Sequence, residues 1–232
     1  MNSKNPPLIF ILLMIFWLPF TTFAQPDESL DDKTLNKDSY LTVNLFSPIN
    51  TLNPRWRIGY IQHLSTRWKA GIDFSFGNRE ISFSDFGNKI ENAYQLWGIR
   101  PELYYLLRSR RRTQKYISAE LFYIHHKDTY HDNFIISRDR HFNYYEQARF
   151  KRQKFGAHIK AGIFQSISKR LGLNIYAGFG FRFRYNSFSN IMNPSQRRDI
   201  RDMFVFDYNE IEGLNLNVDF SLGFKLFYLF KN

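Results

Sequence analysis

Residues 214–230 alternate between two kinds of side chain, and this pattern restricts what the chain can fold into. One set is apolar throughout: Leu214, Leu216, Val218, Phe220, Leu222, Phe224, Leu226, Tyr228 and Phe230. The other is polar or glycine as far as Lys225. Successive side chains of a β-strand point to opposite faces, whereas a helix would mix the two sets. Strands usually have about 5–6 residues, and a tilted strand crosses a bilayer with about 9–11. The stretch therefore predicts a membrane-spanning β-strand.

Seven further segments alternate in the same way: 40–47, 55–63, 68–77, 93–107, 116–127, 154–167 and 171–186. The connections after the second, fourth and sixth segments are short, and those after the third, fifth and seventh are long. Transmembrane barrels have this layout, with short periplasmic turns and long extracellular loops. We therefore predict an all-β fold, an eight-stranded antiparallel up-and-down transmembrane β-barrel over residues 40–232.

The connections carry predictions of their own. Residues 128–152 show no clear period and are expected to be irregular. The loop 187–213 is expected to hold one or two helical turns after Asn193 and Pro194, which fit an N-cap and a first helical position. Pro101 lies within the fourth segment and cannot donate a ladder hydrogen bond, so a bulge or a missing bond is expected there.

The orientation of the two faces follows from volume. A soluble, lipocalin-like barrel would turn its apolar face inward, but an eight-stranded barrel has an interior only just wide enough to be filled by side chains. Eight sets of large apolar side chains do not fit into that space. An Arg or Lys facing the middle of the membrane costs roughly 2–4 kcal/mol. We therefore expect the apolar face to meet lipid and the opposite face to line the interior.

The inward face then carries charges of both signs. Buried charges have to be paired, so we expect a salt-bridge network that fills the lumen, rather than a proton or ion path or a gated pore. Its predicted members are Lys69, Asp73, Arg100, Glu102, Glu120, Lys160, Arg182, Arg184, Asp219 and Lys225.

The N-terminal residues resemble a secretory signal peptide. Lys4 precedes an apolar run at residues 8–20, and Thr22 and Ala24 place small residues at the −3 and −1 positions, so cleavage is expected after Ala24. The run is shorter than the roughly 20 residues of a spanning helix. The chain has no cysteine, which excludes a lipoprotein anchor and disulfides. Residues 25–39 are polar and aperiodic and predict a flexible lead. We expect export to the outer membrane of a Gram-negative bacterium by the general secretory route.

A cluster of histidines and acids follows the fifth segment. His125, His126 and His131 lie near Asp128 and Asp132, and these residue types could form a metal site or an acid–base pair. Some outer-membrane enzymes that modify lipid A or hydrolyse phospholipid use a histidine with a serine and an acid at such a rim. In this sequence, serine is missing at a suitable spacing. We therefore predict no catalytic residues, no metal and no cofactor.

Cations gather near the predicted extracellular boundary. They could pair with lipid A phosphates through charge-assisted hydrogen bonds, or they could form a solvated loop face beside Asp199 and Asp202. The candidates are Arg149, Lys151, Arg152, Lys154, Arg197, Arg198 and Arg201. Residues 110–112 are three consecutive arginines on a predicted periplasmic turn, beside anionic phospholipid headgroups.

Several short motifs carry a resemblance. Residues 100–105 (RPELYY), 168–170 (SKR), 178–181 (GFGF) and 223–229 (GFKLFYL) resemble small Bacteroidota outer-membrane β-barrels of a domain-of-unknown-function family, with a barrel like that of OmpA. The pattern Ser221-x-Gly223-x-x-Leu226-x-Tyr228 resembles the C-terminal β-signal read by the barrel-insertion machinery. The resemblance covers about residues 40–231 and implies fold and location more than activity.

These observations lead to a predicted function. We expect a non-enzymatic envelope protein with a filled lumen, whose loops interact with outer-membrane lipids (lipopolysaccharide and phospholipid) or with a surface protein partner. The alternatives are a lipid A- or phospholipid-modifying enzyme and a narrow channel. A net charge of +11 would also suit nucleic-acid binding, but an exported chain makes a nucleic-acid partner improbable.

Overall fold

The computed structural model describes residues 39–50, 53–80, 93–110, 112–136, 142–197 and 211–230. The chain divides into two compact units, Met1–Leu30 and Asp31–Asn232, and all described residues belong to the second. The predicted signal peptide, its cleavage site after Ala24 and residues 25–38 lie outside the described residues. Among the described residues, no helix is long and apolar enough to cross a bilayer.

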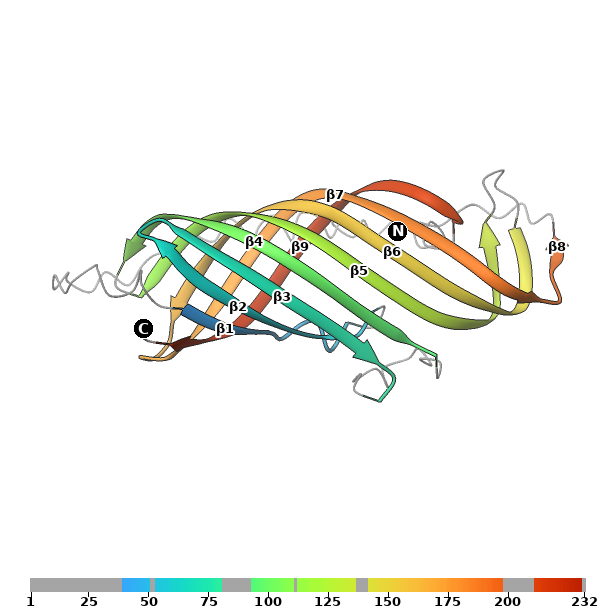
Figure 1. The fold of residues 1–232 in the computed structure, drawn as a ribbon, viewed down its shortest axis with the longest axis horizontal. Helices are drawn as coiled ribbons and strands as arrows, with labels where there is room; N and C mark the ends of the chain where they lie inside the picture. The colour runs from blue at the N-terminus through green and yellow to red at the C-terminus, as the bar shows by residue number, and fades with distance from the viewer. Residues whose placement is uncertain are drawn as a thin grey trace, which may run out of the picture. The chain divides into compact units, whose positions relative to one another are not determined.

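The described residues form one antiparallel sheet (Figure 1). Its strands are β1 (Ser39–Asn44), β2 (Trp56–Ser65), β3 (Trp68–Asn78), β4 (Gln95–Arg110), β5 (Thr113–Ile136), β6 (Phe142–Ser166), β7 (Leu171–Met192), β8 (Ser195–Arg197) and β9 (Gly213–Phe230). β1 to β7 pair in chain order, β7 then pairs with β9, and β9 pairs with β1, so these eight strands make the ring. The short β8 pairs with β6 outside the ring. The prediction of an all-β, up-and-down fold of eight antiparallel strands is therefore confirmed, and the strands form a ring-like sheet.

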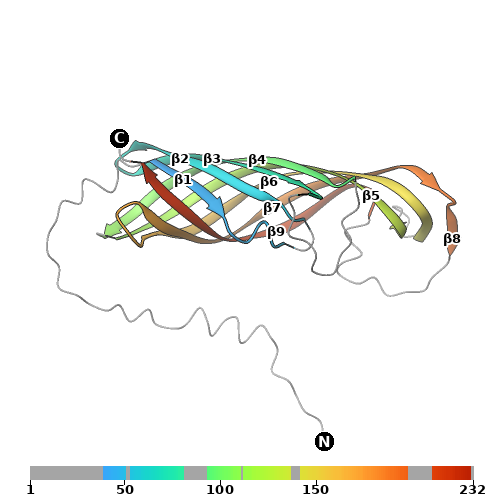
Figure 2. The same cartoon turned by 90° about the horizontal axis from the view of Figure 1, so that it is seen from below.

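β1 and β9, the first and last strands of the ring, pair with each other. Ser39 lies opposite Phe230, Leu41 opposite Tyr228 and Val43 opposite Leu226. Figure 2 shows β1, in blue, alongside β9, in dark red. Each strand of the ring thus has a neighbour on both sides at this end, whereas residues 213–223 of β9 pair with β7 alone.

The two ends of the ring differ. Two residues separate β2 from β3, two separate β4 from β5 and four separate β6 from β7. The end of the ring that holds these three short connections is called the turn end, and the opposite end is called the loop end. Predicted and observed strands agree well in β2, β3, β4 and β9. β1 ends earlier than predicted, at Asn44, and β7 continues to Met192, into residues that were predicted to be a loop.

The prediction of an irregular stretch at 128–152 is wrong. Beyond Lys127, which lies opposite Gln95 at the start of β4, β5 continues to Ile136 and β6 already begins at Phe142. With residues 187–192 of β7 and with β8, these segments make a sheet extension that projects beyond the ring at its loop end (Figure 1). A small core stabilises the extension: Ile135, Tyr145, Ala148, Phe150 and Phe188, with Tyr130 packed against them. The period is hidden in the sequence because polar side chains occur on both faces here.

Two local predictions have different outcomes. The ladder between β4 and β5 lacks pairs at Arg100 and Pro101 without a change of register, so the predicted missing bond at Pro101 is confirmed. After Pro194 the chain forms β8 rather than a helical turn, and residues 198–210 lie outside the described part.

Candidate functional site

The outer face of the ring is apolar from end to end. Phe220 is 76% exposed and Leu222 71% exposed, and large side chains such as Phe74, Leu121 and Ile159 are also exposed. Among the described outward positions of the ring, charged side chains occur only at its ends, with Lys115 at the turn end and Lys127 and Lys151 at the loop end. Soluble monomers rarely expose apolar patches above a few hundred Å², and a larger patch is typical of a surface that contacts a membrane or another protein.

The interior of the ring has three layers. At the turn end, buried rings and aliphatic side chains form a cluster that we call the aromatic plug: Tyr40, Ile61, Tyr104, Leu106, Tyr116, Phe164, Tyr176, Phe227 and Leu229. The rings of Tyr116 and Phe164 are 4.7 Å apart, and those of Tyr40 and Phe227 are 4.9 Å apart. Aromatic pairs at such distances contribute beyond their buried area.

Inward-facing glycines make room for these rings. A Cβ atom at Gly223 would overlap the ring of Tyr176, and one at Gly162 would overlap the ring of Tyr116. Both tyrosines therefore lie across the backbone of a neighbouring strand instead of pointing along the axis. At Gly223 and Gly162 the missing side chain allows the tyrosine ring to lie close to the backbone.

The second layer is an ion-pair network centred on Glu120. Its carboxylate lies 2.8 Å from Lys160 Nζ, 2.9 Å from Arg100 Nη1, 3.1 Å from Arg57 Nη2 and 3.1 Å from His158 Nδ1. Arg57 comes from β2, Arg100 from β4, and both Lys160 and His158 from β6, while Glu120 itself lies on β5. One carboxylate thus links four strands, β2, β4, β5 and β6.

Two further carboxylates share these cations. Asp73 accepts hydrogen bonds from Arg57 Nε at 2.6 Å and from Lys225 Nζ at 2.7 Å. Glu102 lies 2.7 Å from Lys160 Nζ and accepts a hydrogen bond from Ser118 Oγ at 2.6 Å. Removing one partner from such a buried pair leaves an uncompensated charge, at a cost of roughly 3–5 kcal/mol.

All ten residues of the predicted network face inward. Beyond the pairs above, Lys69 Nζ lies 4.3 Å from the centroid of the Tyr40 ring, and Arg182 Nη1 donates to Asp219 at 2.9 Å. Asp219 also lies 3.3 Å from His158 Nε2, and Arg184 is buried.

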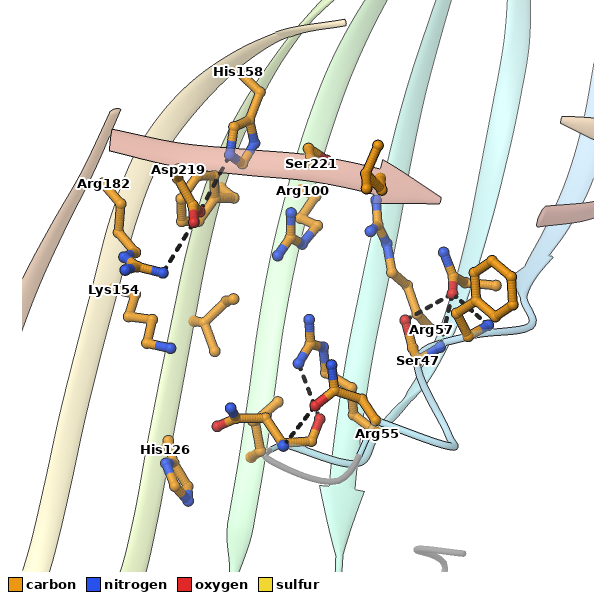
Figure 3. A pocket seen from close by; sticks show the side chains of 18 of the residues that line it. Ser47, Arg55, Arg57, Arg100, His126, Lys154, His158, Arg182, Asp219 and Ser221 are labelled. Carbon is orange, nitrogen blue, oxygen red and sulfur yellow. Dashed lines mark hydrogen bonds and ion pairs between the residues drawn. The ribbon is translucent and has the colours of Figure 1, made fainter. Parts of the chain in front are cut away.

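Above the network, toward the loop end, lies a cavity of about 280 Å³ (Figure 3). Six residues at the end of β1 and in the β1–β2 connection form one wall: Asn44, Phe46, Ser47, Asn50, Asn53 and Arg55. The inner faces of β4, β5, β6, β7 and β9 form the others. Six cations line it: Arg55, Arg57, Arg100, Arg152, Lys154 and Arg182. Asp219 is the one carboxylate among the lining residues, and His126 and His158 lie there as well.

The structure separates the histidine cluster found in the sequence. His125 lies on the outer face, stacked on Trp97 with ring centroids 5.7 Å apart. His126 points into the cavity, with its Nε2 3.7 Å from Asp128, and His131 is exposed on the extension. Among the described residues, no group of three or more acids, histidines or cysteines is arranged to hold a metal.

The cations predicted at the rim also separate. Arg149 and Lys151 are exposed on the outer face, whereas Arg152 is buried and Lys154 points into the cavity. The period of two explains the division, because 149 and 151 have one parity and 152 and 154 the other. The backbone of Arg197 lies in β8, and Arg198 and Arg201 lie outside the described residues.

Sequence reasoning missed three interior residues. Arg57 alternates with Trp56 and Ile58, and Arg55 and His158 have inward parity as well, so the signal was present. It was overlooked because each of these residues is isolated in the sequence, and their shared neighbours, Glu120 above all, come together only when the ring closes.

Neither the family models, nor the curated proteins, nor the solved structures with which the chain was compared give a match.

Proposed function

We propose that this protein is an integral outer-membrane β-barrel with a blocked interior and a non-enzymatic role at the cell envelope. The observation that carries the proposal is the outer face of the ring, which is apolar around the whole circumference and has its charges only at the two ends. Lipid-facing strands have this character, with polar residues on the opposite face.

Other features support the same location. The predicted signal peptide supports export, and the motif around Ser221 and Tyr228 that resembles the insertion signal lies on β9. In this proposal the turn end faces the periplasm and the loop end, with its sheet extension, faces the outside. The resemblance to small Bacteroidota barrels of unknown function remains part of the proposal.

The interior supports a structural rather than a conducting or enzymatic role. The aromatic plug and the network around Glu120 occupy the lower and middle parts of the ring. The histidines that an enzyme could use point to different sides, with His125 outward and His126 inward.

At the loop end, a row of exposed cations supports contact with lipid A phosphates. Lys127 lies directly opposite Lys151, and Arg149 lies one position further along the same face, opposite Thr129. Like charges directly opposite each other on neighbouring strands are destabilising. An anionic headgroup between Lys127 and Lys151 would remove that repulsion, because phosphate oxygens accept charge-assisted hydrogen bonds.

A pair of matched substitutions tests the location. Leu222→Arg puts a charge in the middle of the outer face, where a lipid-facing Arg costs roughly 2–4 kcal/mol, whereas Leu64→Arg puts it beside the turn end, where the cost falls to about 0–1 kcal/mol. We expect the wild-type protein and Leu64→Arg to fractionate with the outer membrane and to migrate differently on a gel before and after boiling. Leu222→Arg should lose most of the folded band.

The proposal fails in either of two cases. One is recovery of the wild-type protein in the soluble fraction, with the same mobility before and after boiling. The other is equal tolerance of both arginines, because two water-exposed sites would accept the charge alike.

A further inference from the structure

The cavity at the loop end contains more positive charge than its own acids neutralise. Arg57 and Arg100 are paired with Asp73 and Glu120 below the cavity, and Arg182 is paired with Asp219. Arg55, Arg152 and Lys154 line the same cavity beside them. Asp219 already interacts with Arg182 and with His158, so its single negative charge is divided between these two partners.

Lys154 lies among other cations of this cavity. Four arginines are close enough to repel its charge: Arg55, Arg152, Arg182 and Arg184. Within the described part of the chain, Lys154 makes no hydrogen bond or ion pair, and Figure 3 shows its ammonium group directed into the open space near Arg182.

The surrounding side chains also leave buried polar atoms without a partner among the described residues. Arg55 Nη1 donates to the carbonyl of Asn53, but its buried Nε lacks a partner among the described residues. His126 is 3% exposed, and its Nδ1 likewise lacks a hydrogen-bond partner in the described part of the chain. Arg152 Nε donates to Asn186 at 2.9 Å, and the guanidinium lies 4.5 Å from the centre of the Phe150 ring.

Such a group of partly buried cations is costly unless an anion joins it. Arg and Lys are the side chains that recognise phosphate oxygens, Arg through its planar fork and Lys as a point charge. The cavity, at about 280 Å³, lies at the lower limit of small-molecule sites, which have roughly 300–1,000 Å³. It therefore suits a small, highly charged ligand rather than an acyl chain.

We propose that the cavity is a binding site for an oxyanion of the phosphate class, with Lys154 at its centre and Arg55, Arg152 and His126 around it. The anion reaches it from the loop end, because the aromatic plug occupies the turn end. The source is either free phosphate or the phosphate of a small headgroup. This inference goes beyond the proposed location and depends only on the interior of the ring.

Calorimetric titration of the purified protein in neutral detergent at low ionic strength tests the site, with inorganic phosphate and glycerol 1-phosphate as probes. We expect one saturable site per chain in the wild type. Lys154→Met, which keeps the length of the side chain and removes its charge, should weaken binding at least about ten-fold. Lys169→Met makes the same change on an exposed turn at the opposite end and should leave the affinity within about two-fold.

Circular dichroism melting of both variants checks their fold. We expect Lys154→Met to fold, because the substitution removes repulsion, and Arg55→Met serves as a second variant if it does not. Binding of inorganic phosphate would identify the free ion as sufficient, and binding of glycerol phosphate alone would identify a headgroup. The proposal is overturned if neither probe binds the wild type, or if the Lys154 and Arg55 variants bind as the wild type does. Because the titration needs only folded protein, its failure is distinct from failure of the membrane location.

Discussion

Glu120 is the carboxylate on which four interior side chains converge. Its carboxylate contacts Arg57, Arg100, Lys160 and His158, and it is 1% exposed. Arg57, Lys160 and His158 each lie beside a second carboxylate as well, that of Asp73, Glu102 and Asp219 respectively. Loss of the charge on Glu120 therefore leaves this buried group with too few negative charges.

Glu120→Gln tests this dependence. The amide keeps the shape and removes the charge, so the buried cations lose their shared partner and we expect a loss of roughly 3–5 kcal/mol in the free energy of unfolding. Glu146→Gln is the matched control, because Glu146 is exposed and accepts a hydrogen bond from Asn193 Nδ2 at 2.7 Å. Its effect should stay within about 0.5 kcal/mol.

Urea unfolding of both variants in the same detergent, followed by tryptophan fluorescence, gives the comparison. Equal stability of Glu120→Gln and the wild type would contradict a network held together by this carboxylate.

At the scale of single residues, the odd or even position of a residue along its strand predicts whether its side chain faces inward or outward. The inward direction of Asp73, Lys160 and Lys225 follows from their alternation with apolar neighbours, and the structure places them inside. The sequence does not contain the choice of partner. Lys225 reaches Asp73 across 152 positions of the chain, and such a contact depends on the register of strands that are distant in sequence. Arg152 and Lys154 were misplaced for a related reason, since the strand that sets their parity was expected to start only at 154.

At the scale of elements, the β5–β6 hairpin shows where pattern reading fails. The segments 171–186 and 214–230 each have one apolar and one polar face, so their strands are readable from sequence. Beyond Lys127, hydrophobic residues such as Tyr130 and Phe150 are mixed with polar ones, because the extension has a core of its own. The period of two weakens there, although the backbone remains extended.

The pair of lysines at the base of this hairpin makes a prediction that depends on the lipid. Lys127 and Lys151 repel each other across β5 and β6, and a like-charged cross-strand pair costs roughly 0.2–1 kcal/mol. In neutral detergent Lys151→Met should therefore raise the thermal midpoint. In vesicles rich in anionic phospholipid the same variant should lower it relative to the wild type, because a bridging headgroup is lost.

Lys169→Met serves as the control for this measurement, since Lys169 lies on the exposed turn between β6 and β7. A shift of the same sign for Lys151→Met in both lipids would rule out a headgroup between the two lysines.

At the scale of the whole molecule, the layers of the interior set what can pass through it. Nine side chains make up the aromatic plug, and the network of Asp73, Glu102 and Glu120 lies above it. We expect the wild-type protein, reconstituted in a planar bilayer, to give no steady current. A stable, ion-selective conductance would contradict the blocked interior.

The ring itself was predictable from the order of short and long connections. Short links after β2, β4 and β6 force antiparallel neighbours. With an even number of such strands, the start of the first strand and the end of the last strand lie at the same end of the ring. The cavity was not predictable, because it depends on how far the β1–β2 connection folds over the ring and on which side chains leave space unfilled. Neither quantity is encoded in a local pattern.

The pairing of β1 with β9 has a consequence for biosynthesis. The ribosome releases β1 before every other strand of the ring and β9 after all of them, yet the two must lie side by side, with Ser39 opposite Phe230. Until β9 has emerged, β1 and β7 each present an unpaired edge, which is a template for association with other chains. The sheet therefore cannot close before its final strand has been made.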